Sequence, residues 1–229
     1  MKALLVTLVV LVGLAVVADR VAVRVADSQV ASQVQQRGNL AGKPEVDITG
    51  FPFLTQAVAG TYDDVRISLT AADLGQPAGT SARVALHGVH LPLSTVLSGS
   101  VSRIPVDRVD GTATLSYALL SQQIGHGTTL TWAADGLRLT TSVTILGQKV
   151  PLSAVGRLRL DGQELVVDAE QASAAGISLP SSVVTRASQA LDLRYKIPAL
   201  PFGLRLTAVR PTPDGVVVDV AATDAVLAG

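Results

Sequence analysis

The chain of 229 residues contains no cysteine, so it can form neither a disulfide framework nor a thiolate metal site. It also lacks an excess of either charge, because 18 lysines and arginines balance 18 aspartates and glutamates. Without a basic run to neutralise a phosphate backbone, nucleic acid is excluded as a partner. Aromatic residues are scarce at 3%, whereas hydrophobic residues make up 48%. The apolar interior must therefore be built from valine, leucine, alanine and isoleucine.

Signatures of catalysis and of metal binding are also missing. No G-x-S-x-G pentapeptide, the nucleophile elbow of α/β-hydrolases, occurs. His87 and His90 are three residues apart, which in a regular strand points them to opposite faces, so a shared metal requires a break at Gly88. Asp63 and Asp64 are neighbours that diverge in a strand, whereas an acid and a base must converge on one bond. We expect no enzyme activity, no metal and no cofactor.

The longest apolar run, residues 3–18, follows Lys2 and ends before Asp19. As a helix it would be about 24 Å long at roughly 1.5 Å per residue, short of the roughly 30 Å hydrocarbon core. That length, and the small residues Val16 and Ala18, favour a signal peptide cleaved before Asp19. A helical pattern that continues past Asp19 favours an uncleaved anchor, so both alternatives stay open. In either case the rest of the chain is exported to the periplasm or cell envelope.

Residues 19–37 are predicted to form an amphipathic helix that ends near Gly38. Its apolar residues recur at steps of three and four and so share one helical face: Val23, Ala26, Val30 and Val34. Packing on the sheet of its own domain is favoured over a place on the membrane surface, because the charge of the helix is mixed and not basic.

From Glu45 onward apolar and polar residues alternate with a period of two, which predicts antiparallel strands with one dry and one wet face. Tight hairpin turns are predicted at four Asp-Gly pairs, which begin at Asp110, Asp135, Asp161 and Asp214. Two further helices are expected over residues 115–124 and 181–191. The predicted fold class is α+β, mainly β, with residues 19–229 in a single domain.

Two segments of the chain carry motifs of a known family. The first is Gly50-Phe51-Pro52-Phe53-Leu54-Thr55-Gln56, followed by Gly60 and Tyr62, and the second is Leu200-Pro201-Phe202-Gly203-Leu204, followed by Pro211, Asp214 and Gly215. With the hydrophobic N-terminal segment that leads into a helix, these motifs resemble the LmeA family of actinobacterial envelope proteins. The resemblance covers essentially the whole exported chain. It implies a phospholipid-binding protein connected with lipid or lipoglycan homeostasis, whose bent antiparallel sheet wraps around a long helix as in tubular lipid-binding domains.

The site expected from this resemblance is an aliphatic groove that binds phospholipid, and the membrane surface is a second expected partner. We expect the loop of Phe51, Pro52, Phe53 and Leu54 to form an apolar lip that enters a membrane or closes the groove. Tyr62 and Arg66 are the expected contacts to the polar head group. The wall is expected from the dry faces of the strands: Val65, Ile67, Leu69, Trp132, Leu137, Leu139, Val143, Ile145, Leu204 and Leu206.

Less specific interpretations of the same residues remain alongside the lipid groove. Phe51 and Phe53 would equally suit a structural plug at the end of the core, and Trp132 a place in the core. The dry faces could also be filled by the helix alone, which would make the protein a non-enzymatic adaptor or structural protein of the envelope. An enzyme acting on envelope glycolipids is the third class, although no convergent set of catalytic groups can be named for it.

Overall fold

The structure is a computed structural model of the chain. It describes residues 2–98, 101, 103–124, 128–134, 136–145, 148–162, 164–174, 193–196 and 200–228. The chain divides into two compact units. Unit 1 comprises Met1–Leu69, Arg83–Asp110 and Ala222–Gly229, and unit 2 comprises Thr70–Ala82 and Gly111–Ala221. The assignment of residues 19–229 to a single domain stays a prediction.

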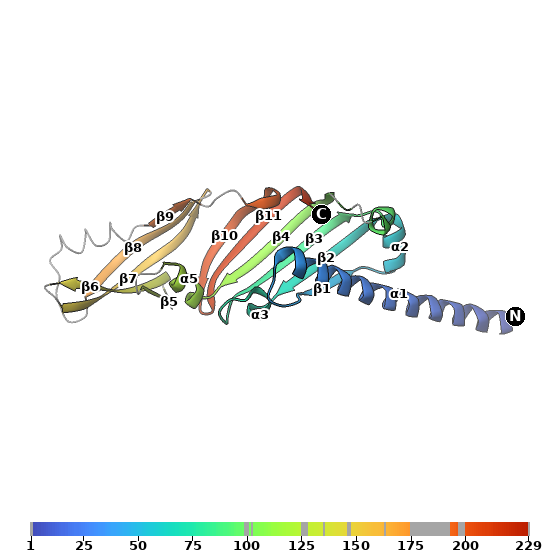
Figure 1. Cartoon of the computed structure of the whole chain (residues 1–229), viewed down its shortest axis with the longest axis horizontal. Coiled ribbons are helices and arrows are strands. Elements are labelled where there is room, and N and C mark those ends of the chain that lie inside the picture. Colours follow the sequence, from blue (N-terminus) through green and yellow to red (C-terminus); the bar gives the residue numbers. More distant parts are fainter. Residues whose placement is uncertain are drawn as a thin grey trace. The chain divides into compact units, whose positions relative to one another are not determined.

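Helices occupy the N-terminus and several connections between strands (Figure 1). They are α1 (Lys2–Gly38), α2 (Phe53–Ala59), α3 (Ala71–Leu74), α4 (Leu93–Leu97) and α5 (Tyr117–Ile124), with a 3-10 turn at Pro201–Gly203. The helix expected over residues 115–124 is thus confirmed as α5. The helix expected over residues 181–191 lies outside the described residues.

The strands form two sheets. The six-stranded sheet has the order β1-β2-β3-β4-β11-β10 and the five-stranded sheet the order β5-β6-β7-β8-β9. Their bounds are β1 (Glu45–Thr49), β2 (Thr61–Leu69), β3 (Ser81–His90), β4 (Arg103–Leu115), β5 (Thr129–Ala133), β6 (Gly136–Ile145), β7 (Gln148–Asp161), β8 (Glu164–Ala174), β9 (Leu193–Lys196), β10 (Arg205–Thr212) and β11 (Gly215–Ala228). The predicted fold class, mainly antiparallel sheet with an apolar N-terminal helix, is confirmed.

Helix α1 is continuous from the apolar run into the amphipathic segment and ends at Gly38, as predicted (Figure 1). Val23 and Ala31 of α1 are buried, and α1 contacts β1. On the same side, Asp27 Oδ1 accepts a hydrogen bond of 2.9 Å from the backbone N–H of Ile48. Because β1 is an edge strand, this carboxylate satisfies a donor that has no partner strand. The second half of α1 is therefore fixed along the edge of the sheet.

The first hairpin of the sheet in unit 1 shows how alternation separates the two faces. One face carries the pairs Val46–Ile67 and Ile48–Val65, and the other carries the pair Asp47–Arg66. Val46, Ile48 and Val65 are buried, whereas Asp47 and Arg66 are exposed. The dry and wet faces predicted from the period of two are confirmed for these strands.

Two of the four Asp-Gly pairs lie where hairpins turn, and a third begins at Asp135, which lies outside the described residues between β5 and β6. Strands β5 and β6 pair up to Ala133 and Gly136, β7 and β8 up to Asp161 and Glu164, and β10 and β11 up to Thr212 and Gly215. The turn expected at Asp110 is wrong, because β4 runs through this position without interruption. Asp110 is instead held by an ion pair with Arg108, and Gly111 is buried inside the strand.

Candidate functional site

The predicted apolar lip lies at the start of α2 in unit 1, and its residues point in different directions. Phe51 is 63% exposed and Leu54 is 42% exposed, whereas Phe53 is 7% exposed. The ring of Phe53 packs against that of Tyr62, with 6.0 Å between the centroids and an angle of 35°. Burial raises the pKa of the Tyr62 phenol above its ordinary value. Phe53 thus holds α2 on strand β2, and Phe51 and Leu54 remain at the surface.

The first turn of α2 is capped by a residue from a distant part of the chain. Its N-cap position is Pro52, which makes no side-chain capping hydrogen bond. Instead Asp19 of α1, only 2% exposed, accepts a hydrogen bond of 2.8 Å from the backbone N–H of Leu54. Arg20 lies 2.6 Å from the Asp19 carboxylate and places its guanidinium 5.0 Å from the centre of the Phe51 ring. A negative side chain at a helix N-terminus also favours the helix dipole.

The predicted wall residues of β2 and the predicted head-group contact Arg66 lie on opposite faces of the strand. Val65 is buried and Ile67 partly buried on the apolar face, and Leu69 at the end of the strand is partly buried. Arg66 points from the other face and pairs with Asp64 at 2.7 Å. An acyl chain on the apolar face would therefore be separated from Arg66 by the thickness of the sheet.

The wet face of unit 1 carries a row of charged side chains from β2, β3 and β4. The imidazole of His87 lies between two carboxylates, 3.4 Å from Asp64 and 3.3 Å from Asp110. His90 pairs separately with Asp107 at 2.9 Å. Among the described residues no group of three or more histidine, aspartate or glutamate residues is arranged to hold a metal. Each imidazole of the row thus has aspartate oxygens as its neighbours.

Gly88 explains why both histidines reach aspartates of the neighbouring strand. Its φ of +62° interrupts the regular alternation of β3, and Leu86 and Val89, which are three residues apart, are both buried. A Cβ at Gly88 would come within 2.1 Å of the Asp107 carboxylate. The break at Gly88, which the sequence required for the two histidines to share a face, is therefore present, but each imidazole binds its own aspartates.

In unit 2 the register of the five-stranded sheet places several predicted wall residues side by side. Leu130 pairs with Leu139, and Trp132 pairs with Leu137. Leu137 and Leu139 pair in turn with Gly156 and Ala154 of β7. Leu130 and Leu137 are buried and Leu139 is partly buried, whereas Trp132 is 45% exposed at the edge strand β5. Trp132 is thus too exposed for a core residue.

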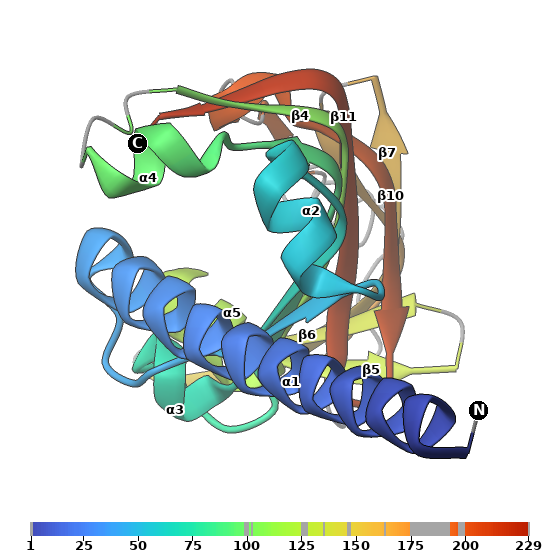
Figure 2. The ribbon, with the colours of Figure 1, turned by 90° about the vertical axis from the view of Figure 1, so that its right-hand side faces the viewer.

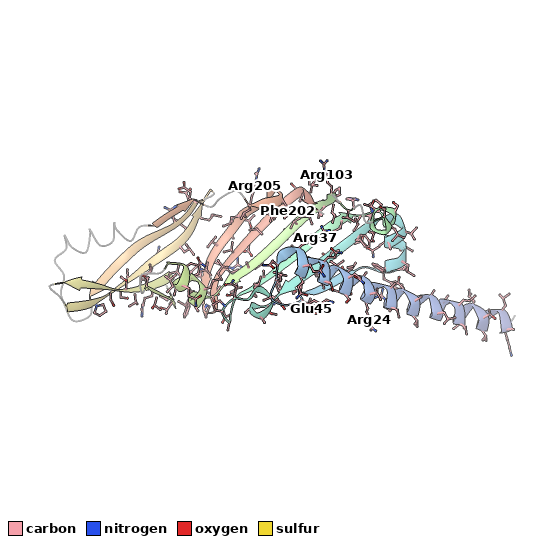
Figure 3. The ribbon with its side chains drawn as sticks, viewed as in Figure 1. Arg24, Arg37, Glu45, Arg103, Phe202 and Arg205 are labelled. Carbon is pink, nitrogen blue, oxygen red and sulfur yellow. The ribbon has the colours of Figure 1, made fainter. Side chains whose placement is uncertain are left out.

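The remaining wall residues lie further along these sheets. The backbone of β6 pairs Val143 with Val150 and Ile145 with Gln148, at the end of β6 far from β5. Leu206 of β10 pairs with Val220 of β11, and both side chains are partly buried. Leu204, just before β10, is partly buried, and Phe202 in the preceding turn is 43% exposed (Figure 3).

A pocket of about 310 Å³ opens on unit 2. Its lining comes from the β5–β6 turn, from β7 and from β10: Ala134, Gly136, Arg157, Leu158 and Pro211. Leu158 follows Gly156 on the apolar side of β7, and Pro211 pairs with buried Val216 on the apolar side of β10 and β11. Arg157 is the charged residue among the five that line the pocket.

The predicted site residues therefore divide between the units. Unit 1 contains the residues between Phe51 and Leu69, and unit 2 contains those from Trp132 to Ile145 with Leu204 and Leu206. Sequence reasoning missed Val58 of α2, which is 80% exposed, and Leu93 and Val96 of α4, which are 40% and 44% exposed. The signal that could have found them is the lack of any charged residue over residues 50–60 and 91–98.

A family model described as LmeA-like phospholipid-binding matches residues 17–221. No curated protein and no solved structure matches the chain.

Proposed function

The chain belongs to the LmeA-like phospholipid-binding family, and we propose that it binds phospholipid in an aliphatic groove in the cell envelope, where it supports the homeostasis or transfer of lipid or lipoglycan. The observation that carries this proposal is the family match over most of the chain. The proposed role of the sheets is to offer their apolar faces to the acyl chains, and no cofactor is required.

The register of the sheets supports an aliphatic groove. In the five-stranded sheet the pairs Leu130–Leu139 and Trp132–Leu137 lie on one face, while Arg138 of the same hairpin points to the other. In the six-stranded sheet, strands β10 and β11 carry a similar aliphatic pair, Leu206–Val220. Branched aliphatic side chains make an irregular apolar surface that discriminates weakly between acyl chains. Selectivity for one lipid must then come from polar groups at the groove mouth.

The energetics of transfer suit a groove of this kind. An acyl chain of about 16 carbons exposed to water costs on the order of 12 kcal/mol, at roughly 0.8 kcal/mol per CH₂. This cost makes unaided diffusion between membranes slow. If a groove is nearly as apolar as the bilayer, movement of the chain between the two is close to neutral and needs no nucleotide hydrolysis.

The direct test is native mass spectrometry of the full chain extracted from its own envelope, together with two variants of adjacent β6 residues. Leu139→Gln puts an amide on the proposed wall, and we expect about tenfold less bound phospholipid, equivalent to roughly 1.4 kcal/mol. Arg138→Gln is the matched control on the opposite face and should retain wild-type lipid. Circular dichroism checks that both variants keep their sheet content.

Two results would count against the groove. Wild-type protein that never retains phospholipid under native extraction would favour the adaptor, in which the protein's own side chains fill the space. Equal loss of lipid in both variants would mean that the wall is not formed by this face of β6.

A further inference from the structure

The exposed apolar surface of α1 is longer than the uncharged run in the sequence. The polar residue that ends the run, Asp19, is turned inward and only 2% exposed. The outer side continues with Val21 and Val25, which are 55% and 57% exposed. Residues 4–25 span roughly 33 Å at about 1.5 Å per residue, which matches a hydrocarbon core of roughly 30 Å. Among the described residues α1 is the one helix that is long and apolar enough to cross a membrane.

Two arginines follow the uncharged run of α1, where basic residues commonly flank a membrane-spanning helix. Arg20 and Arg24 are exposed, one helical turn apart, and Arg24 points away from the strands (Figure 3). Long basic side chains can keep their stems in the apolar region and their charges at the phosphate level. The contact between Arg20 and Phe51 places an aromatic ring at the same level.

A set of exposed apolar side chains lies on α4, on α2 and at the residue before its N-cap, and α2 contacts α1. We call it the apolar foot, and it consists of Phe51, Leu54, Val58, Leu93 and Val96. Helix α2 contacts both α1 and α4 (Figure 2). The hydrogen bond from Leu54 N–H to Asp19 fixes the start of α2 at the level where the uncharged run ends.

Helix α4 is held against α2 by the backbone. The N–H of Leu91 donates to the carbonyl of Gly60 at 2.8 Å, and a Cβ at Gly60 would lie 2.8 Å from Pro92 Cα. Helices α2 and α4 are therefore both fixed relative to α1, whose N-terminal half extends beyond the sheet at this end (Figure 1). Neither residues 50–60 nor residues 91–98 contain a charge that would oppose entry into a bilayer surface.

We propose that α1 is retained as a membrane anchor and that the apolar foot is embedded in the outer leaflet of the membrane that α1 crosses. The occupant of this surface is thus the lipid of one particular membrane, not a protein partner. The foot's purpose, loading of the groove from that leaflet, rests on the proposed function, whereas its depth in the bilayer can be measured without any lipid transfer.

The absence of cysteine makes the depth measurement simple, because each introduced cysteine is the one labelled site. The full chain is reconstituted in vesicles of phosphatidylcholine and phosphatidylglycerol as Val58→Cys, Val96→Cys or Glu45→Cys, and is labelled with an environment-sensitive fluorophore. Glu45 is the control, because it is exposed at the end of β1 far from α2 (Figure 3). Spin-labelled lipids then quench each fluorophore according to its depth.

We expect blue-shifted emission and at least threefold stronger quenching at Val58 and Val96 than at Glu45. Adding Asp19→Ala should weaken the quenching at Val58 without bringing it to the Glu45 level, because α2 then opens more often but is still packed on β2 through Phe53. Intact-mass analysis of protein from native membranes should show residues 2–18 still present.

Equal quenching at all three sites, or a mature chain that begins after Ala18, would overturn the embedded foot. Native mass spectrometry of the same samples separates this failure from failure of the proposed function. Bound phospholipid without quenching refutes the foot alone, and quenching without bound phospholipid refutes the groove alone.

Discussion

The contact between Asp19 and α2 makes a quantitative prediction. Asp19→Ala removes the acceptor of the Leu54 N–H at a buried position. Loss of an N-cap costs about 1 kcal/mol, and leaving the donor unsatisfied raises the total to about 2 kcal/mol. At 1.4 kcal/mol per factor of ten, local opening at the start of α2 should become about 30-fold more frequent. Asp19→Asn keeps an oxygen acceptor and loses the charge, so we expect only about a threefold change.

Hydrogen–deuterium exchange of the full chain, resolved for peptides covering α2 and β1, measures these changes directly. The matched control is Asp27→Ala on the same helix, whose carboxylate accepts from Ile48 N–H. It should speed exchange at Ile48 and leave Leu54 unchanged, while Asp19→Ala should do the reverse. If Asp19→Ala leaves the exchange of Leu54 within twofold of wild type, then Asp19 does not cap α2 and the level assigned to the apolar foot is wrong.

Three further predictions concern stability. Val106→Ala, at a residue 1% exposed, should lower the free energy of unfolding by about 2 kcal/mol in urea; a change below about 0.5 kcal/mol would show that this site is not packed. Gly60→Ala should lower the melting temperature more than Gly162→Ala. Both glycines have positive φ, but a Cβ at Gly60 would lie 2.8 Å from Pro92, whereas no atom lies within 4 Å of a Cβ at Gly162. Equal shifts in melting temperature would refute the steric reason. Burial opposes ionisation of Asp219, but hydrogen bonds from Thr112 and Arg210 outweigh it and hold its pKa below the ordinary value. Its stabilisation is thus present above about pH 4 and lost as the pH falls through the lower folded-state pKa. Asp219→Asn should cost about 0.5–1 kcal/mol at pH 7, allowing for solvent screening, and weaken the acid dependence of unfolding; an unchanged acid profile would contradict this.

A substitution at Phe53 would not test the apolar lip alone. Because this ring is 7% exposed and packs on Tyr62, a charged residue in its place would be expected to unfold α2 as well as change lipid uptake. Substitutions at Val58 and Val96 avoid this ambiguity, since their side chains are exposed.

The sequence determined the elements whose formation depends on neighbouring residues. The period of two over residues 65–69 predicts the dry and wet faces of β2, because successive side chains in a strand alternate. The Asp-Gly pairs at residues 161–162 and 214–215 predict hairpin turns, because glycine adopts the backbone angles that tight turns need. The family motifs around Phe51 predict phospholipid binding in general, in agreement with the family match.

Only the tertiary structure decided features that depend on residues far apart in the chain. The Asp-Gly pair at Asp110 lies inside a strand because neighbouring strands and the ion pair with Arg108 override the local turn preference. Phe53 and Leu54 are adjacent in the sequence, yet one is buried and the other exposed because α2 packs on β2. Asp19 ends an apolar run in the sequence, and only folding brings it to a helix 35 residues later. Long-range packing, which local patterns do not encode, selects the residues that remain at the surface.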